Sequence, residues 1–226
     1  MAYYLRLMGP DDIAQITAID HEAFPTMWPP PDFKNELKNR LAHYIVACEE
    51  GRTIEETATR AISERVFSGL VSQVQRLFGH EPLSEAEVPV FSREYVVGFA
   101  GFWVVAGEAH LTNIAVREES RHHGIGELLL ISVIDQATGL KAHLGTLEVR
   151  VSNDAALSLY GKFGFTRTGL RCGYYTDNRE DAVLMSLENI SSASFQRRLQ
   201  QLKDAHFGRW GYPYEKLPAK SYVSAR

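Results

Sequence analysis

Two glycines with one residue between them, Gly124 and Gly126, separate a strand-like segment over residues 109–116 from a helix-like segment that follows. The first N–H groups of a helix have no partner within it, and the helix dipole places roughly half a positive charge at the same end. A glycine turn at that point can therefore hold an anion such as a pyrophosphate. The spacing matches neither the P-loop nor GxGxxG, and ordinary turn chemistry would also account for a glycine pair here.

Glu148 and Arg150 alternate with apolar residues over 146–151, which predicts a strand on which the two charged side chains share one face. A strand-face salt bridge is the plainest interpretation of that pair. Tyr160 falls in the helix expected to follow, at helical spacing from other apolar residues, where core packing would equally explain it. The residue types alone leave these positions open between structure and chemistry.

These positions lie within an alternation of predicted strands and helices. Strands are expected over residues 3–8, 43–48, 95–105, 109–116, 146–151, 165–175 and 182–187, and helices over 13–24, 33–41, 128–139 and 155–163. Apolar residues at three- and four-residue steps predict one further, long amphipathic helix over 53–78, followed by a polar loop over 80–94. A short helix is expected again after residue 194. This order predicts an α/β or α+β fold, with a mixed central sheet and helices on both faces.

The composition is that of an ordinary globular chain. With 226 residues, 45% of them hydrophobic and 23% charged, we expect one domain with additions. No apolar stretch reaches the roughly 18 to 20 residues of a membrane helix, and the N-terminus lacks the features of a signal peptide, so a cytoplasmic protein is expected. Cys48 and Cys172 form no CxxC pair, so neither a disulfide framework nor a zinc site is expected.

Charge divides the chain into a body and a tail. Residues 191–226 carry seven basic and two acidic residues, a net charge of +5, whereas residues 1–190 carry 17 basic and 26 acidic residues, a net charge of −9. The tail also contains Trp210, Tyr212 and Tyr214 among its cations. Docking on an acidic partner would suit it, but folding back onto the acidic body is favoured, because aromatic side chains tend to become buried.

Eight short segments, in one consistent order, carry a resemblance to a known family. They cover residues 113–116, 121–126, 147–150, 152–153, 159–160, 164–165, 174–175 and 180–182. Together they resemble the GNAT acetyltransferases, and most of all the ribosomal-protein-alanine N-acetyltransferase branch, which modifies protein N-termini. The resemblance implies a GNAT domain over residues 1–190 with a helical insertion over 51–94, and leaves 191–226 as a basic C-terminal extension.

The resemblance implies acetyl-CoA as co-substrate and no metal. In the family, the backbone of one strand pairs with the pantetheine arm, and a glycine-containing loop holds the pyrophosphate. The matching positions are Ile114, Ala115, Val116, Arg121, His122, His123, Gly124, Ile125, Gly126, Glu127 and Asn153. His122 and His123 stand where the branch usually has paired arginines. Because neutral histidine attracts phosphate less, affinity for the cofactor is expected to be lower or pH-dependent.

The resemblance also assigns catalytic and acceptor positions. Glu148 matches the general base that takes the ammonium proton, and Tyr160 matches the general acid that protonates the departing CoA thiolate. No covalent enzyme intermediate is implied. Four residues match the slot for the acceptor, a protein or peptide N-terminus such as that of a ribosomal protein: Phe24, Pro25, Tyr174 and Tyr175. Capping of the core would also explain these aromatic residues, and no nucleic-acid binding is expected.

Two other functions stay open. The chain could acetylate a small-molecule amine, because the cofactor motifs are common to the whole superfamily, or it could be a CoA-binding regulatory module without turnover. The Glu148 and Tyr160 pattern with the adjacent tyrosines argues against the first. Retention of both proton-transfer candidates argues against the second.

Overall fold

The computed structural model describes residues 2–26, 31–57 and 90–218. Its contacts divide the chain into two compact units, Met1–Glu50 with Val96–Arg226, and Gly51–Tyr95. The helices among the described residues, and the candidate site, belong to the first unit. In the second, the described residues are the ends of two strands, where the Arg52 guanidinium lies 3.7 Å from the centre of the Tyr95 ring.

Within the described residues, seven strands form one mixed sheet in the order β1-β2-β3-β4-β5-β7-β6. The strands are β1 (Tyr3–Leu7), β2 (Ala42–Thr57), β3 (Val90–Val105), β4 (Glu108–Val116), β5 (Leu144–Arg150), β6 (Thr166–Arg171) and β7 (Ala182–Glu188). β4 and β5 are parallel, whereas β1 with β2, β3 with β4, β5 with β7 and β6 with β7 are antiparallel. A helical crossover between β4 and β5 is what parallel neighbours require.

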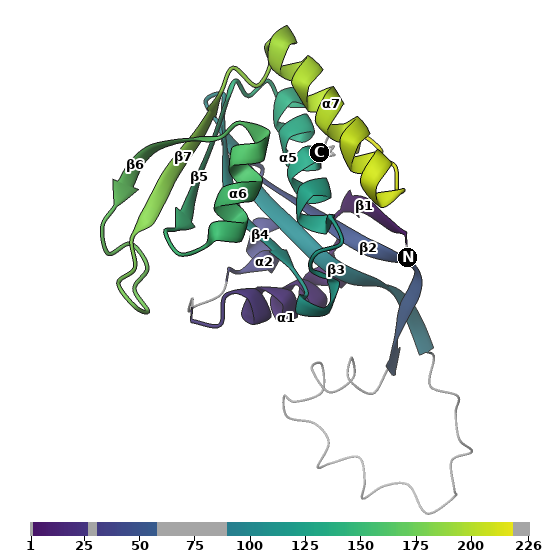
Figure 1. The fold of residues 1–226 in the computed structure, drawn as a ribbon. Helices are drawn as coiled ribbons and strands as arrows, with labels where there is room; N and C mark the ends of the chain where they lie inside the picture. Colours follow the sequence, from purple (N-terminus) through teal and green to yellow (C-terminus); the bar gives the residue numbers. More distant parts are fainter. Residues whose placement is uncertain (1, 27–30, 58–89, 219–226) are drawn as a thin grey trace, which may run out of the picture. The chain divides into compact units, whose positions relative to one another are not determined.

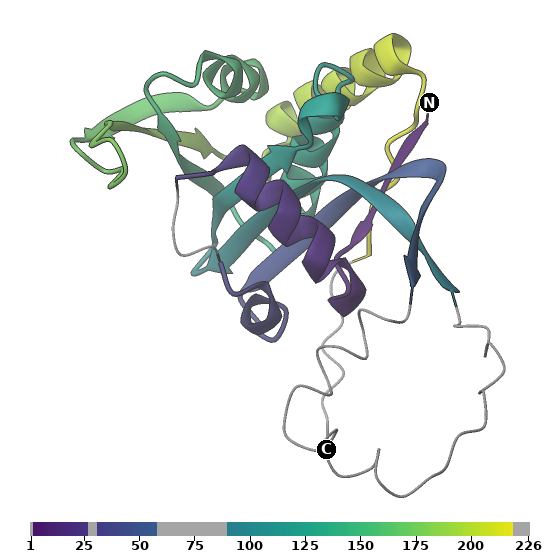
Figure 2. The same ribbon diagram turned by 90° about the horizontal axis from the view of Figure 1, so that it is seen from below.

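Helices cover both faces of this sheet, as the sequence predicted. In Figure 1 and Figure 2, α1 (Ile13–Ala23) and α2 (Phe33–Glu36) lie on one face, and α5 (Ile125–Gly139), α6 (Asp154–Phe163) and α7 (Ala193–Trp210) lie on the other. Two 3-10 turns, η1 (Pro10–Asp12) and η2 (Glu118–Ser120), come before α1 and α5. None of the described helices is long and apolar enough to cross a membrane.

The bounds of α6 follow from its first and last residues. The Asn153 side chain accepts a hydrogen bond from the N–H of Ala156 at 3.1 Å, which caps the start of the helix. Gly164 ends the helix with φ 94°, in the left-handed region that glycine adopts without a steric penalty. The cap and the glycine therefore set both ends of this short helix, which begins four residues after β5.

The central helix α5 is buried almost all round. Its residues Leu128, Leu129, Leu130 and Ile131 are at most 1% exposed. The sheet covers one side and α7 packs on another, where Lys203 Nζ lies 2.5 Å from Asp135 Oδ2. A helix that is apolar on all sides needs such a double cover. The preference for a tail that folds back is confirmed by these contacts for its described part.

Several expected boundaries are wrong. The helix expected over 33–41 ends at Glu36, and the helix expected to be short after residue 194 is α7, which has 18 residues. Residues 53–57, predicted as the start of a long helix, belong to β2, and residues 90–94, predicted as loop, belong to β3. Pairing between neighbouring strands overrides the helical spacing there, and β-branched Thr53 and Ile54 suit a strand. The remainder of the predicted helix, 58–78, lies outside the described residues. β6 ends at Arg171, so Tyr174 and Tyr175 lie in the β6–β7 loop and not in a closing strand.

Candidate active site

β4 and β5 run side by side and then separate. Their register ends at Leu111 and Leu147, after which β4 continues along β3 and β5 continues along β7. A shift in the β3–β4 register leaves Thr112 as an extra residue on β4, the mark of a bulge that bends a strand. Within the described residues, the β4 edge beyond the bulge pairs with no residue of β5. Of the three positions expected to hold the pantetheine arm, Ile114 and Val116 point their backbone groups to this open edge, whereas Ala115 points toward Phe99 of β3.

Glu148 stands where the two strands part. Its side chain is only 10% exposed, and its two oxygens contact two different bases. Oε2 lies 3.2 Å from Nε2 of His110 on β4, and Oε1 lies 3.1 Å from Nη2 of Arg171 on β6. The carboxylate thus lies between two side-chain nitrogens, one from β4 and one from β6, beside the open edge of β4.

His110 joins Glu148 to a second carboxylate through one hydroxyl. The Thr146 hydroxyl donates to Glu108, so it accepts from Nδ1–H of His110, 2.9 Å away. Nε2, the other ring nitrogen of His110, is therefore the one that faces Glu148.

Tyr160 is buried in the second turn of α6. It is 5% exposed, and its ring centre lies 5.8 Å from that of Phe165. Burial raises the pKa of the Tyr160 phenol well above its ordinary value, and the neighbouring Tyr175 adds to the rise. The phenol therefore stays protonated at neutral pH and is available as a donor.

The loop that leads into α5 is bent by two left-handed residues. His122 has φ 64° and Gly124 has φ 79°, and Gly124 serves as the N-cap residue of the helix. The first N–H groups of α5, at Ile125, Gly126 and Glu127, point away from the helix without an acceptor inside it. Outside the backbone of α5 and the adjacent residues, a Cβ on Gly126 would lie within 4 Å of one described atom, Leu159 Cδ2, at 3.7 Å. The turn thus offers backbone donors beside free space, which suits a phosphate.

Four other cofactor candidates have exposed side chains. The side chains of Arg121, His122 and His123 are exposed beside this turn. Asn153 is exposed too, but its side-chain oxygen is engaged in capping α6. The cofactor contact expected for Asn153 would therefore involve its amide nitrogen.

Glu127, in the first turn of α5, is in contact with a lysine and with a buried histidine. Lys162 Nζ on α6 lies 2.7 Å from Glu127 Oε1, and Nδ1 of the buried His206 on α7 lies 3.5 Å from the same oxygen. Burial alone would raise the pKa of the Glu127 carboxyl, but hydrogen bonds from His206 and Lys162 hold it below its ordinary value. Glu127 thus connects α5 with α6 and α7, and Lys162 compensates its negative charge beside the glycine turn.

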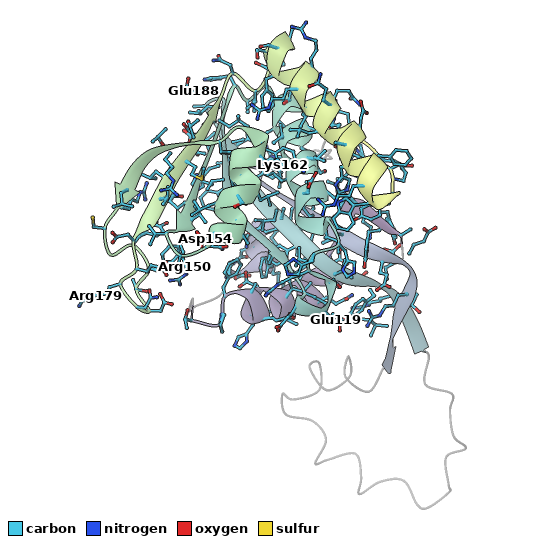
Figure 3. All side chains as sticks on the ribbon, viewed as in Figure 1. Glu119, Arg150, Asp154, Lys162, Arg179 and Glu188 are labelled. Atoms are coloured by element: carbon cyan, nitrogen blue, oxygen red, sulfur yellow. The ribbon has the colours of Figure 1, made fainter. Side chains whose placement is uncertain are left out.

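Arg150 organises the opposite side of the site. Its guanidinium donates to Asp177 at 2.9 Å and to Glu180 at 3.0 Å in the β6–β7 loop. The same group lies 3.8 Å from the centre of the Tyr175 ring. Figure 3 labels Arg150 and Asp154 close together where β5 leads into α6, while Lys162 is at the other end of that helix. The salt bridge expected between Glu148 and Arg150 is not made, because each has other partners.

The four acceptor candidates come from two loops in contact. Thr26, directly after Pro25, donates a hydrogen bond to Asp177 of the β6–β7 loop. Phe24 is half-buried and packs against the core, whereas Pro25 is exposed. In the other loop, the Tyr174 and Tyr175 rings meet edge to face at 5.2 Å, and Tyr174 is 42% exposed. The two loops meet at one place beside Arg150.

Several residues of this region were not singled out from the sequence. His110 and Arg171 contact Glu148, yet they precede and follow it by more than 20 residues. A predicted β4–β5 pairing would have placed His110 beside Thr146 and hence near Glu148, since these strands are parallel. No comparable signal existed for Arg171, whose position depends on the pairing of β6 with β7.

Comparison with known proteins identifies the class to which this fold and site belong. The sequence profile described as "Acetyltransferase (GNAT) family" matches residues 77–165. An N-alpha-acetyltransferase from Sulfolobus acidocaldarius is 32% identical over 81% of this chain and 91% of its own length. The chain belongs to the GNAT family of acetyltransferases.

Individual relatives lie in one part of that family. A Bacillus subtilis protein, provisionally named a [ribosomal protein bS18]-alanine N-acetyltransferase, is 31% identical over 80% of this chain and 92% of its own length. The Escherichia coli enzyme of that name is 43% identical over 41% of this chain and 64% of its own length. The crystal structure of the Escherichia coli ribosomal-protein-S18-alanine N-acetyltransferase superposes with a TM-score of 0.60 at 25% identity, covering 84% of this chain and 96% of that one.

Proposed function

We propose that this protein transfers an acetyl group from acetyl-CoA to the α-amino group of a protein N-terminus, such as that of a ribosomal protein. One observation carries the proposal: a nearly buried carboxylate, Glu148, stands where β4 and β5 separate and is held by His110 and Arg171. The names of the relatives support an N-terminal acceptor. Those names describe the relatives, so the acceptor of this chain is determined by the experiment below.

The residues present suit acetyl-CoA as the second substrate. The open edge of β4 supplies backbone donors and acceptors at Ile114 and Val116 for the amide groups of the pantetheine arm, whereas the backbone groups of Ala115 point toward Phe99 of β3. The start of α5 supplies N–H groups and a partial positive charge for the pyrophosphate. Space beside Gly126 allows a phosphate to approach the backbone closely. Acetyl-CoA itself supplies an activated thioester, which an amine attacks directly.

The proton transfers can be assigned to two side chains. An α-amino group has a pKa of about 7.7 to 8.0, so a fraction of it is neutral at pH 7, whereas a lysine amine near 10.4 is almost wholly protonated. Glu148 accepts the proton that the amine loses on attack, directly or through one water, and His110 is in contact to share it. Tyr160, kept protonated by burial, donates to the thiolate as the C–S bond breaks. The products are an N-acetyl amide and free CoA.

The proposal is tested by the rate of CoA release with three acceptors at pH 7. These are a peptide with a free α-amine, the same peptide with that amine acetylated and one internal lysine, and a polyamine. We expect release with the first and little with the others. Faster release with the polyamine would favour a small-molecule acetyltransferase. CoA binding without turnover on any amine would favour a regulatory module.

A further inference from the structure

The end of α7 lies on the loop that leads into α5, although the two are separated by more than 80 residues of chain. The indole of Trp210 packs on Gly124 so closely that a Cβ on this glycine would overlap it. Two residues later, the Tyr212 hydroxyl donates a hydrogen bond to the His123 carbonyl. Tyr212 is 4% exposed, so this contact is inside the fold.

Two aromatic rings also pack against Tyr212. Its ring meets that of Tyr3 on β1 edge to face at 5.5 Å, and that of His206 on α7 at 5.3 Å. His206 in turn contacts Glu127 in the first turn of α5. The C-terminal segment therefore contacts the loop and the start of α5 at three residues, His123, Gly124 and Glu127.

The loop needs such support for its shape. His122, a residue with a Cβ, has φ 64°, and Gly124 has φ 79°. Left-handed conformations cost free energy for residues other than glycine, and they persist where the surrounding structure holds them. The direction of the N–H groups after His123 depends on these two residues, so a contact that fixes the His123 carbonyl also fixes the donors that follow it.

We propose that Trp210 and Tyr212 are positioning residues of the cofactor site, which hold the loop over residues 121–126 in the shape that presents its N–H groups to the pyrophosphate. The proposal rests on acetyl-CoA being the second substrate, as proposed above. It gives the C-terminal extension a function in cofactor affinity, in addition to covering α5. Neither side chain needs to touch the cofactor, because both act through the backbone of the loop.

The test compares Tyr212→Phe and Trp210→Phe with the wild-type protein and with Tyr214→Phe. Tyr214 lies two residues beyond Tyr212, and its ring faces Lys203 on α7 at 4.8 Å. Loss of one intramolecular hydrogen bond corresponds to roughly a 3- to 10-fold change in an equilibrium constant. We expect Tyr212→Phe to raise the Kd of acetyl-CoA and its KM by about that factor, with the peptide KM unchanged.

Thermal midpoints of all variants show whether the fold is kept. We expect Trp210→Phe to weaken cofactor binding as Tyr212→Phe does, and Tyr214→Phe to bind like the wild type. Unchanged acetyl-CoA affinity in both variants, with wild-type binding intact, would overturn this inference and leave the proposed function standing. Tighter binding would also overturn it, because the tail would then compete with the cofactor. A wild-type protein that binds no acetyl-CoA would overturn the proposed function and the inference together.

Discussion

The two sides of the candidate site differ in whether backbone groups or side chains form them. The side proposed to bind the cofactor consists of backbone: an open strand edge after a bulge, a loop bent by left-handed residues, and the first N–H groups of a buried helix. The side proposed to bind the acceptor consists of side chains: Arg150 with Asp177 and Glu180, and Thr26 with Asp177, across two exposed loops. Glu148 lies between the two sides.

This difference separates what the fold determines from what individual residues determine. A binding site formed by backbone groups changes only when the conformation of the main chain changes. Such a site suits a cofactor that a whole family shares. A side-chain site can be altered by single substitutions on loops without disturbing the sheet, so it suits the acceptor, which differs between family members. Substitutions on the two sides should therefore affect different kinetic constants.

The largest effect is expected from Glu148→Gln, at the boundary of the two sides. The amide keeps the shape of the carboxylate but cannot accept the proton, so kcat should fall by about 10²- to 10⁴-fold, the usual contribution of a positioned general base. Acetyl-CoA affinity by calorimetry should change little. Glu188→Gln, at the exposed end of β7, is the matched control. Unchanged turnover at pH 7 would remove Glu148 from the mechanism.

Tyr160→Phe should give the next largest loss, of about 100-fold in kcat. This lies at the lower end of the range for general acids, because a thiolate with a pKa near 8.5 leaves with less assistance than an alkoxide. Only a hydroxyl is removed from a packed ring, so the thermal midpoint should stay close to that of the wild type. If steady-state rates with peptide were unaffected, Tyr160 would be a packing residue.

Gly126→Val tests the backbone side alone. A branched side chain would fill the space beside the first N–H groups of α5, and a steric cost of about 1 to 3 kcal/mol corresponds to roughly 5- to 150-fold weaker acetyl-CoA binding. Gly139→Val, at the last residue of the same helix, where a Cβ would meet open space, is the control. Titration calorimetry measures the acetyl-CoA affinity of both folded variants. If the two variants bound acetyl-CoA equally well, the phosphates would have to lie elsewhere.

Arg150→Lys changes only the side of the site that side chains form, and we expect it to have the smallest effect. Lysine keeps the charge but cannot bond Asp177 and Glu180 with a planar fork, so the β6–β7 loop should be less well held. We expect the peptide KM to rise about 3- to 10-fold, which corresponds to roughly 0.7 to 1.4 kcal/mol. The acetyl-CoA KM should stay constant. A change in the cofactor KM instead would mean that the two sides are not separable.

Local signals in the sequence predicted much of the fold. Alternation over 146–151 placed Glu148 on a strand, and Gly164 marked the end of α6, where φ is 94°. Features that depend on pairing between distant segments were missed. The extension of β2 to Thr57 is one, because helical spacing in the sequence says nothing about a neighbouring strand.

The same distinction applies to the site. The glycine turn before α5 was predicted because its signal lies in consecutive residues. The partners of Glu148 were not, because His110 and Arg171 reach it only through the order of strands in the sheet. The contact of Tyr212 with His123 joins residues 89 positions apart, and no local pattern in the tail indicated it.

The central claim, transfer to an α-amino group, is tested most directly by one mass-spectrometric measurement. A peptide that carries both a free N-terminal α-amine and an internal lysine is incubated with the protein and acetyl-CoA at pH 7, and fragmentation locates the added acetyl group. The account predicts a single acetyl group on the N-terminal nitrogen, and none when Glu148→Gln replaces the wild type over the same time. Acetylation at the lysine nitrogen, with the α-amine left free, would contradict it.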